Sequence, residues 1–180
     1  MKKLNIKRAF KTLVKNGEGT IYWQTFNNGN YLVGNAHCII TVSESDFHDN
    51  FDVINSTKVK LVNSECLLNV ARKCAEHLDT EYMKPTIVSI MVGKTDTQVL
   101  KTSRTKRLTV VNKEYMQCLE DAGSTMLFVS KKDTSIKEPL FEMLTDEKQE
   151  LVKFFCVLPI CCDVENVLND VLTKNIIYVR

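Results

Sequence analysis

Basic side chains at regular spacing form the pattern in this sequence that most clearly indicates chemistry. Near the start of the chain they recur every four residues, with an arginine among them: Lys3, Lys7, Lys11, Lys15 and Arg8. Residues four apart lie on one face of a helix. Such a row of cations would bind phosphates through charge alone, without reading the bases. The alternative is that the lysines only keep the outer face of an amphipathic helix in water.

A second basic cluster lies in the sequence KTSRTKR at 101–107. Its four cations are Lys101, Arg104, Lys106 and Arg107. The surrounding pattern predicts a turn between two strands, and such a turn could hold phosphate or meet an acidic protein surface. The alternative is a solvated hairpin tip. The sequence does not indicate whether this turn and the first basic row face the same way.

Two aromatic residues lie in an otherwise polar segment, SESDFHDNFDVINST at 43–57. An irregular segment has few ways to bury large side chains, so Phe47 and Phe51 are predicted to be exposed contacts for another protein. The aromatic residues Tyr22, Trp23 and Phe26 belong to a predicted strand and are expected to fill the core instead.

Catalytic and metal-binding patterns are weak. A catalytic cysteine needs a positioned histidine, and His37 and Cys38, as neighbours in a strand, would point to opposite faces. A zinc site needs four ligands at close spacing, and only Cys74 and His77 form a half-pair. No catalytic residue, metal or cofactor is therefore predicted, although a cysteine-dependent or zinc enzyme remains a third alternative.

Composition limits the class of protein. The chain has 180 residues, 44% of them hydrophobic, and 24 Lys+Arg against 22 Asp+Glu give a net charge of +2. This near balance favours neither a strongly basic nucleic-acid coat nor an acidic DNA mimic. No signal peptide or long apolar run is recognisable, and seven cysteines at irregular spacing favour reduced thiols. We expect a soluble protein of the cytoplasm, inside a host cell, with no membrane partner.

The first half predicts helices and strands in alternation. Apolar spacing predicts a helix over 5–16, and a meander of strands follows over 20–26, 31–33 and 37–43. A strand at 58–62 leads to Ser64, which can cap a helix to about Leu78. Residues 79–85 are predicted to be a loop because Pro85 ends helical geometry. Two strands then follow, at 86–92 and 97–101.

The second half has a similar outline. A strand at 107–111 precedes a helix that Asn112 caps and that runs through Ala122 to a stop at Gly123. Three strands are expected over 124–130, 136–144 and 150–160. A final helix capped by Asp163 and a terminal strand at 176–179 complete the prediction.

Both halves resemble the repeating βαβββ half-domain of DNA polymerase sliding clamps. The sequence RLTVVNKEYMQCLEDA looks like a clamp strand and inner helix, and EPLFEML with FFCVLPI is similar to the paired closing strands. The sequence NNGNYLVGNAHCIITV looks like a hairpin of small clamp-like phage and prophage proteins. The resemblance covers roughly 1–45 and 106–160. It implies an α+β fold with an N-terminal half at 1–105, which contains an insertion, and a C-terminal half at 106–180.

Two functions follow as hypotheses. The preferred one is a non-enzymatic, phage-type protein that engages DNA, or a nucleoprotein such as a polymerase complex, through the first helix and the 101–107 turn. In a clamp-like fold the helices line the face toward DNA. The alternative is an inhibitor of the anti-CRISPR type, which blocks a host defence nuclease by protein–protein contact. A homodimer is possible in either case, because a terminal strand could pair two chains.

Overall fold

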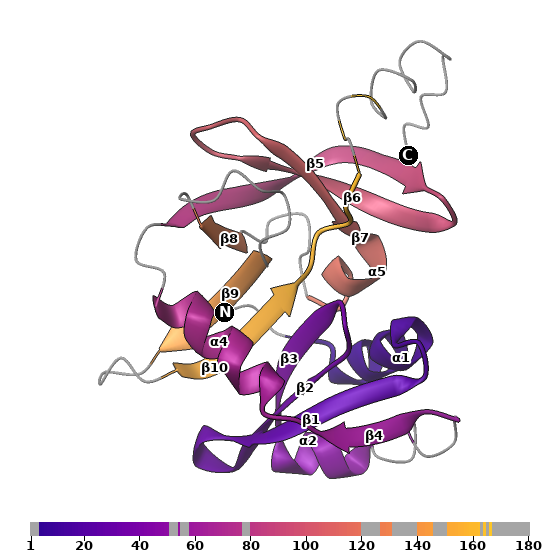
Figure 1. Cartoon of the computed structure of the whole chain (residues 1–180), viewed down its shortest axis with the longest axis vertical. Coiled ribbons are helices and arrows are strands. Elements are labelled where there is room, and N and C mark those ends of the chain that lie inside the picture. The colour runs from indigo at the N-terminus through magenta and orange to yellow at the C-terminus, as the bar shows by residue number, and fades with distance from the viewer. Residues whose placement is uncertain are drawn as a thin grey trace.

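The computed structural model describes residues 4–50, 54, 58–76, 80–119, 127–130, 140–145, 151–162, 164 and 166. Its described strands belong to one ten-stranded sheet in the order β4-β1-β2-β3-β10-β9-β8-β5-β6-β7. The pairing is antiparallel except between β1 and β4. Helices pack on the faces of this sheet (Figure 1). The predicted α+β class is confirmed.

Helix α1 (Ile6–Asn16) forms where the apolar spacing predicts it. The Asn5 side chain accepts a hydrogen bond from the Arg8 amide at 3.1 Å, which satisfies one of the amides that a helix start leaves unpaired. Its inner face is buried, with Phe10 and Leu13 each 1% exposed. The helix ends at Gly17, where a Cβ atom would lie 2.6 Å from the Leu13 carbonyl.

The predicted meander after α1 is also present. It consists of β1 (Thr20–Phe26), a short 3₁₀ turn, β2 (Asn30–Gly34) and β3 (Cys38–Ser43), with neighbouring strands paired antiparallel. Strand β4 (Lys60–Asn63) pairs in parallel with β1. Helix α4 (Cys66–Glu76) then crosses the sheet face that Leu32 and Phe154 line, opposite the face covered by α1.

A second group of strands forms the other end of the sheet. Strands β5 (Thr80–Val92) and β6 (Thr95–Thr102) make a long hairpin, and β7 (Leu108–Asn112) pairs with β6. Asn112 then caps α5 (Lys113–Met116) by accepting a hydrogen bond from the Glu114 amide. Because Tyr115 and Met116 enter the same core cluster as Phe10, α5 and α1 lie on the same side of the sheet.

Three strands from late in the chain join the two groups. They are β8 (Leu127–Ser130), β9 (Leu140–Thr145) and β10 (Leu151–Val157). Strand β10 pairs with β3, and β8 pairs with β5, so the late strands lie between the two early groups. The sheet therefore interleaves residues from both predicted halves of the chain.

The predicted loop at 79–85 is wrong, because β5 begins at Thr80. Proline lacks an amide hydrogen and is tolerated in a strand where no ladder bond needs one. Pairing between β5 and β8 is described for Thr80 to Met83. On its other side Pro85 lies opposite Leu100 of β6, where the register between the two strands begins to shift, and such a bulge is a place where a strand tolerates proline.

Two other local predictions differ from the structure. Residues 44–49, within the segment predicted to be irregular, form helix α2 (Glu44–Asp49), with the Ser43 side chain accepting from the Asp46 amide at 3.1 Å. Helix α5 ends at Met116, because the chain turns at Gln117 and Leu119 bridges to Leu4. The end of that predicted helix, the predicted C-terminal helix and the terminal strand lie outside the described residues, apart from Val164 and Asn166.

Candidate nucleic-acid interface

The outer face of α1 carries the first predicted basic row. Lys7, Arg8, Lys11 and Lys15 are all exposed. Within the described residues, no acidic side chain pairs with Lys7 or Lys11. Four residues of helix advance about 6 Å along its axis. The structure therefore presents three lysines in line on one face, while Lys3 lies outside the described residues.

Helix α5 contacts the edge of this face. Glu114 forms an ion pair with Lys15 and accepts a hydrogen bond from the Asn16 amide group at 3.0 Å. These two hydrogen bonds and the lysine charge lower the pKa of the Glu114 carboxyl against the opposing effect of desolvation. The Arg8 guanidinium donates to the Gln117 side chain. Two of the four cations are thus held by Glu114 of α5 and by Gln117, the residue after it, and the other two extend into solvent.

The buried side chain of Asn35 fixes α1 against α5. Its amide nitrogen donates to the Leu13 carbonyl at 3.0 Å and to the Tyr115 hydroxyl at 2.8 Å. Its oxygen accepts from the amides of His37 and Cys38 at 2.8 and 3.0 Å. A buried amide with all these bonds satisfied orients its neighbours strongly. Asn35 therefore sets which face of α1 is turned to solvent.

The second basic cluster is the loop between β6 and β7, as predicted. Its interior is filled by the carboxylate of Glu81, whose side chain is 1% exposed. This carboxylate accepts hydrogen bonds from the amides of Arg104 and Thr105 and from the Thr105 hydroxyl, and Arg107 lies 4.0 Å away. Desolvation raises the pKa of Glu81, but these donors outweigh it and the pKa is lowered.

The loop therefore uses its own anion-binding groups internally. The two amides that could hold a phosphate already hold Glu81, and Lys106 donates to the Ser103 carbonyl at 2.5 Å from a left-handed backbone position with φ 60°. Of the four predicted cations, Arg107 is partly buried, whereas Lys101, Arg104 and Lys106 are exposed. The sequence placed Glu81 in a loop, so no local signal indicated this role.

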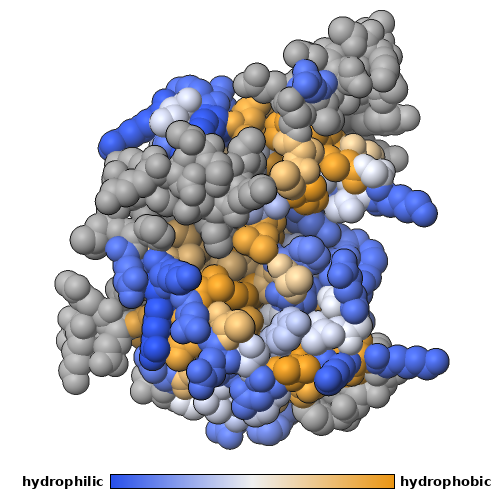
Figure 2. All heavy atoms as spheres, viewed as in Figure 1, coloured by the Kyte–Doolittle hydropathy of each residue, from blue (hydrophilic) through white to orange (hydrophobic). Residues whose placement is uncertain are grey.

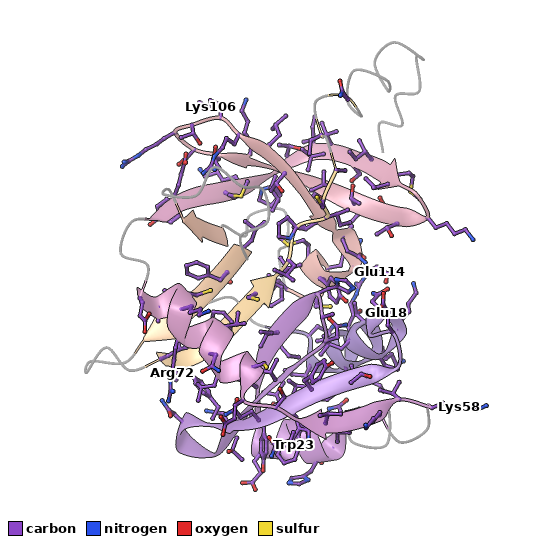
Figure 3. All side chains as sticks on the ribbon, in the orientation of Figure 1. Glu18, Trp23, Lys58, Arg72, Lys106 and Glu114 are labelled. Atoms are coloured by element: carbon purple, nitrogen blue, oxygen red, sulfur yellow. The ribbon has the colours of Figure 1, made fainter. Side chains whose placement is uncertain are left out.

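The two basic clusters lie apart in the view of Figure 3. Lys106 marks the loop at the upper end of the molecule, whereas Glu18, just beyond the end of α1, lies lower down, near Glu114.

Phe47 is not an exposed contact residue. It lies in α2 with 4% of its surface exposed, and its ring stacks on Tyr31 with centroids 4.6 Å apart. Trp23, labelled in Figure 3, and Phe10 complete the cluster at 5.8 and 6.5 Å. Phe47 lies on the inner side of helix α2, and its ring is therefore buried. Phe51 lies outside the described residues.

The thiols and imidazoles give no assembled reactive group within the described residues. Among the described residues no disulfide joins any of the seven cysteines, and no three His, Cys, Asp or Glu side chains come together in a metal-binding arrangement. His37, just before β3, is exposed, whereas Cys38, the first residue of β3, is buried. Burial raises the pKa of the Cys38 and Cys156 thiols, because desolvation disfavours a thiolate.

No protein-family model, curated protein or solved structure matches this chain. Among the helices that the structure describes, none has both the length and the apolar character that crossing a membrane requires.

Proposed function

We propose that this protein is a non-enzymatic, phage-type binding protein that engages the phosphate backbone of DNA through the outer face of α1. The observation that carries the proposal is the row of exposed lysines on the outer face of α1. Hydrogen bonds from Asn35 fix the orientation of this helix from its inner side. Lys7 and Lys11 lie about 6 Å apart along the axis. Phosphates on one strand of a duplex advance about 3.4 Å each along the duplex axis, and they are further apart in space because the strand winds around that axis, so the lysine spacing is comparable to the distance between neighbouring phosphates.

The placement of α5 supports the same proposal. It lies beside α1 on one side of the sheet, as the clamp resemblance implies for the two inner helices (Figure 1). Gln117, the residue after α5, is exposed next to Arg8, so it extends the polar surface without adding a second acid beyond Glu114. Contacts of this kind fix position on the backbone and do not select a sequence.

The test is fluorescence anisotropy of labelled double-stranded DNA at low and physiological salt. We expect binding that weakens steeply as salt rises, because each lysine on a phosphate releases a counterion. Replacing Lys7 and Lys11 by alanine is expected to reduce the slope of log K against log salt by about 1.8, at about 0.9 for each contact. Lys15 is left in place because it pairs with Glu114.

The matched control removes the same charge from another face. Lys60 on β4 and Lys73 on α4 are both exposed, and their double alanine variant should bind DNA with the wild-type salt slope. Equal slopes for the two double variants would contradict the proposal. Absence of DNA binding at either salt would favour the anti-CRISPR type of inhibitor, for which co-purification with a guide-loaded nuclease is the direct assay.

A further inference from the structure

A pocket of about 350 Å³ lies between the start of α4 and strands β1, β3 and β10. Figure 2 shows apolar side chains gathered in the hollow beside this helix. The buried residues of its walls include Asn35, Cys38, Ile39, Leu67 and Cys156. Residues with exposed or partly exposed side chains form its mouth, among them His37, Ser64, Cys66 and Val70. The pocket therefore has a mainly apolar interior and a mouth that opens to solvent.

Hydrogen bonds hold both walls of the pocket in place. On one wall the Asn35 side-chain oxygen accepts from the His37 amide at 2.8 Å, and the Leu158 amide donates to the His37 carbonyl at 2.8 Å. On the other wall the Leu68 amide donates to the Gln24 side-chain oxygen at 3.2 Å, which joins α4 to β1. A pocket with fixed walls binds its ligand at a lower entropic cost than one that must open.

The volume of the pocket sets the size of its ligand. An engineered apolar cavity of about 150 Å³ in another protein binds benzene. At about 350 Å³ this pocket has a little more than twice that volume, which corresponds to roughly ten to twelve non-hydrogen atoms. The part of the ligand inside must be apolar, because a polar group buried there without a partner would lose its hydrogen bonds to water.

Charge at the mouth favours a ligand with an anionic end. Lys73 is exposed on α4, three residues after Val70 and so on the same face of the helix. Helical side chains lean toward the helix N-terminus, which directs Lys73 back toward the mouth. His37 and Ser64 add hydrogen-bond donors there. Among the described residues, none that lines the pocket is acidic, and Glu65 is not part of the lining.

We propose that this pocket binds a medium-chain carboxylate, with its hydrocarbon chain in the interior and its carboxylate at the mouth beside Lys73. A chain of about ten carbons fills the volume. The apolar interior recognises the chain, and the cation and donors at the mouth recognise the carboxylate. A shorter chain leaves part of the interior empty, and a longer chain leaves its last methylenes in water.

The first experiment is isothermal titration calorimetry of the full chain with hexanoate, octanoate and decanoate, each below the concentration at which it forms micelles. Affinity should rise by about fourfold for each added methylene, because burial of one methylene contributes about 0.8 kcal/mol. Tetradecanoate should gain little over decanoate. Val70→Trp places an indole at the mouth and should weaken decanoate binding at least about tenfold. Absence of decanoate binding, or equal affinity for all four carboxylates, would overturn the inference.

The carboxylate is tested with a neutral ligand of the same chain length. Lys73→Ala should weaken decanoate binding by about threefold, as loss of an exposed ion pair does, and should leave decanol binding unchanged. Arg72→Ala is the matched control, because Arg72 is an exposed cation of the same helix on another face. Arg72→Ala should bind decanoate as wild type does. An equal loss for decanoate and decanol in Lys73→Ala would contradict the assignment of the carboxylate to this mouth.

A labelling experiment on the wild-type chain does not depend on the folding of any variant. Cys66 lines the mouth and is exposed, and Cys161 is exposed without lining the pocket. Saturating decanoate should slow alkylation of Cys66 by iodoacetamide severalfold and leave Cys161 unchanged. Unchanged alkylation of Cys66 would place the ligand elsewhere and overturn the inference. Because α4 and α1 cover opposite faces of the sheet, DNA binding is scored separately from ligand binding.

Discussion

Two segments of the chain carry four described basic residues each, helix α1 and the loop at 101–107, and the fold anchors them by different means. Helix α1 is anchored from its inner side by Asn35, a neutral residue that forms hydrogen bonds with backbone groups and with the Tyr115 hydroxyl. The loop is anchored by Glu81, an anion that takes up the loop's own amides. The two segments carry equal numbers of cations. The amides of the loop are already taken up by Glu81, whereas no described anion occupies the outer face of α1 in this way.

Removing Asn35, which anchors α1, should have the largest effect on the free energy of unfolding. Asn35→Ala leaves the Leu13 carbonyl, the Tyr115 hydroxyl and two amides without their partner in a buried site. We expect the free energy of unfolding to fall by roughly 3 kcal/mol. Urea unfolding followed by the fluorescence of Trp23, the single tryptophan, measures this. Asn69→Ala, exposed on α4, is the control and should change it by less than about 0.5 kcal/mol.

Breaking the loop anchor should cost somewhat less. Glu81→Gln replaces a carboxylate that accepts three hydrogen bonds with an amide that presents one acceptor oxygen. A loss of about 2 kcal/mol is expected, together with faster tryptic cleavage after Arg104 and Lys106. Glu76→Gln on the exposed side of α4 serves as the matched variant. Wild-type cleavage rates in Glu81→Gln would show that the carboxylate does not hold the loop.

The pH dependence of stability separates the two anchors. The folded pKa of Glu81 is lowered from 4.5, so its contribution is complete above that value. As pH falls through 4.5 toward the folded pKa, the contribution is lost, because the unfolded chain binds the proton more readily. Urea midpoints over this window should fall less steeply in Glu81→Gln than in wild type. Asn35→Ala should keep the wild-type slope, and a flattened slope there would contradict the distinction.

The smallest effect concerns the one acid beside the lysine row. Lys15 and Glu114 are 66% and 36% exposed, so their ion pair is worth at most about 1 kcal/mol. Glu114→Gln should therefore change the unfolding free energy by less than that. It should also tighten DNA binding modestly, because it removes a negative charge from the α1 face. Weaker DNA binding in Glu114→Gln, measured by anisotropy, would place the contact elsewhere.

The local sequence pattern predicted the helices and strands that are determined by residues close together in the chain. The four-residue spacing of Phe10 and its neighbours gave α1, and alternation with an Asn-Gly turn gave β1 to β3. Helix α2 was missed although Ser43 and Asp46, three apart, form a capping pair that the sequence displays. The start of β5 was missed because Pro85 reads as a breaker in the local sequence, whereas it lies at a bulge in the pairing with β6.

The local sequence pattern could not predict the site residues whose contacts lie far away along the chain. Asn35 bonds to Tyr115, 80 positions away, and Glu81 bonds to amides more than 20 positions away. Phe47 was predicted to be exposed because its segment is polar, whereas α2 turns it inward onto Tyr31. The two-half division and the clamp-like function stay predictions.

The measurement that tests the central claim most directly is lysine footprinting of the protein with and without double-stranded DNA, by acetylation and mass spectrometry. If the outer face of α1 contacts the phosphates, Lys7 and Lys11 should lose reactivity on binding, while Lys101 and Lys106 on the loop keep theirs. Protection of the loop lysines with unchanged reactivity at Lys7 and Lys11 would contradict the account.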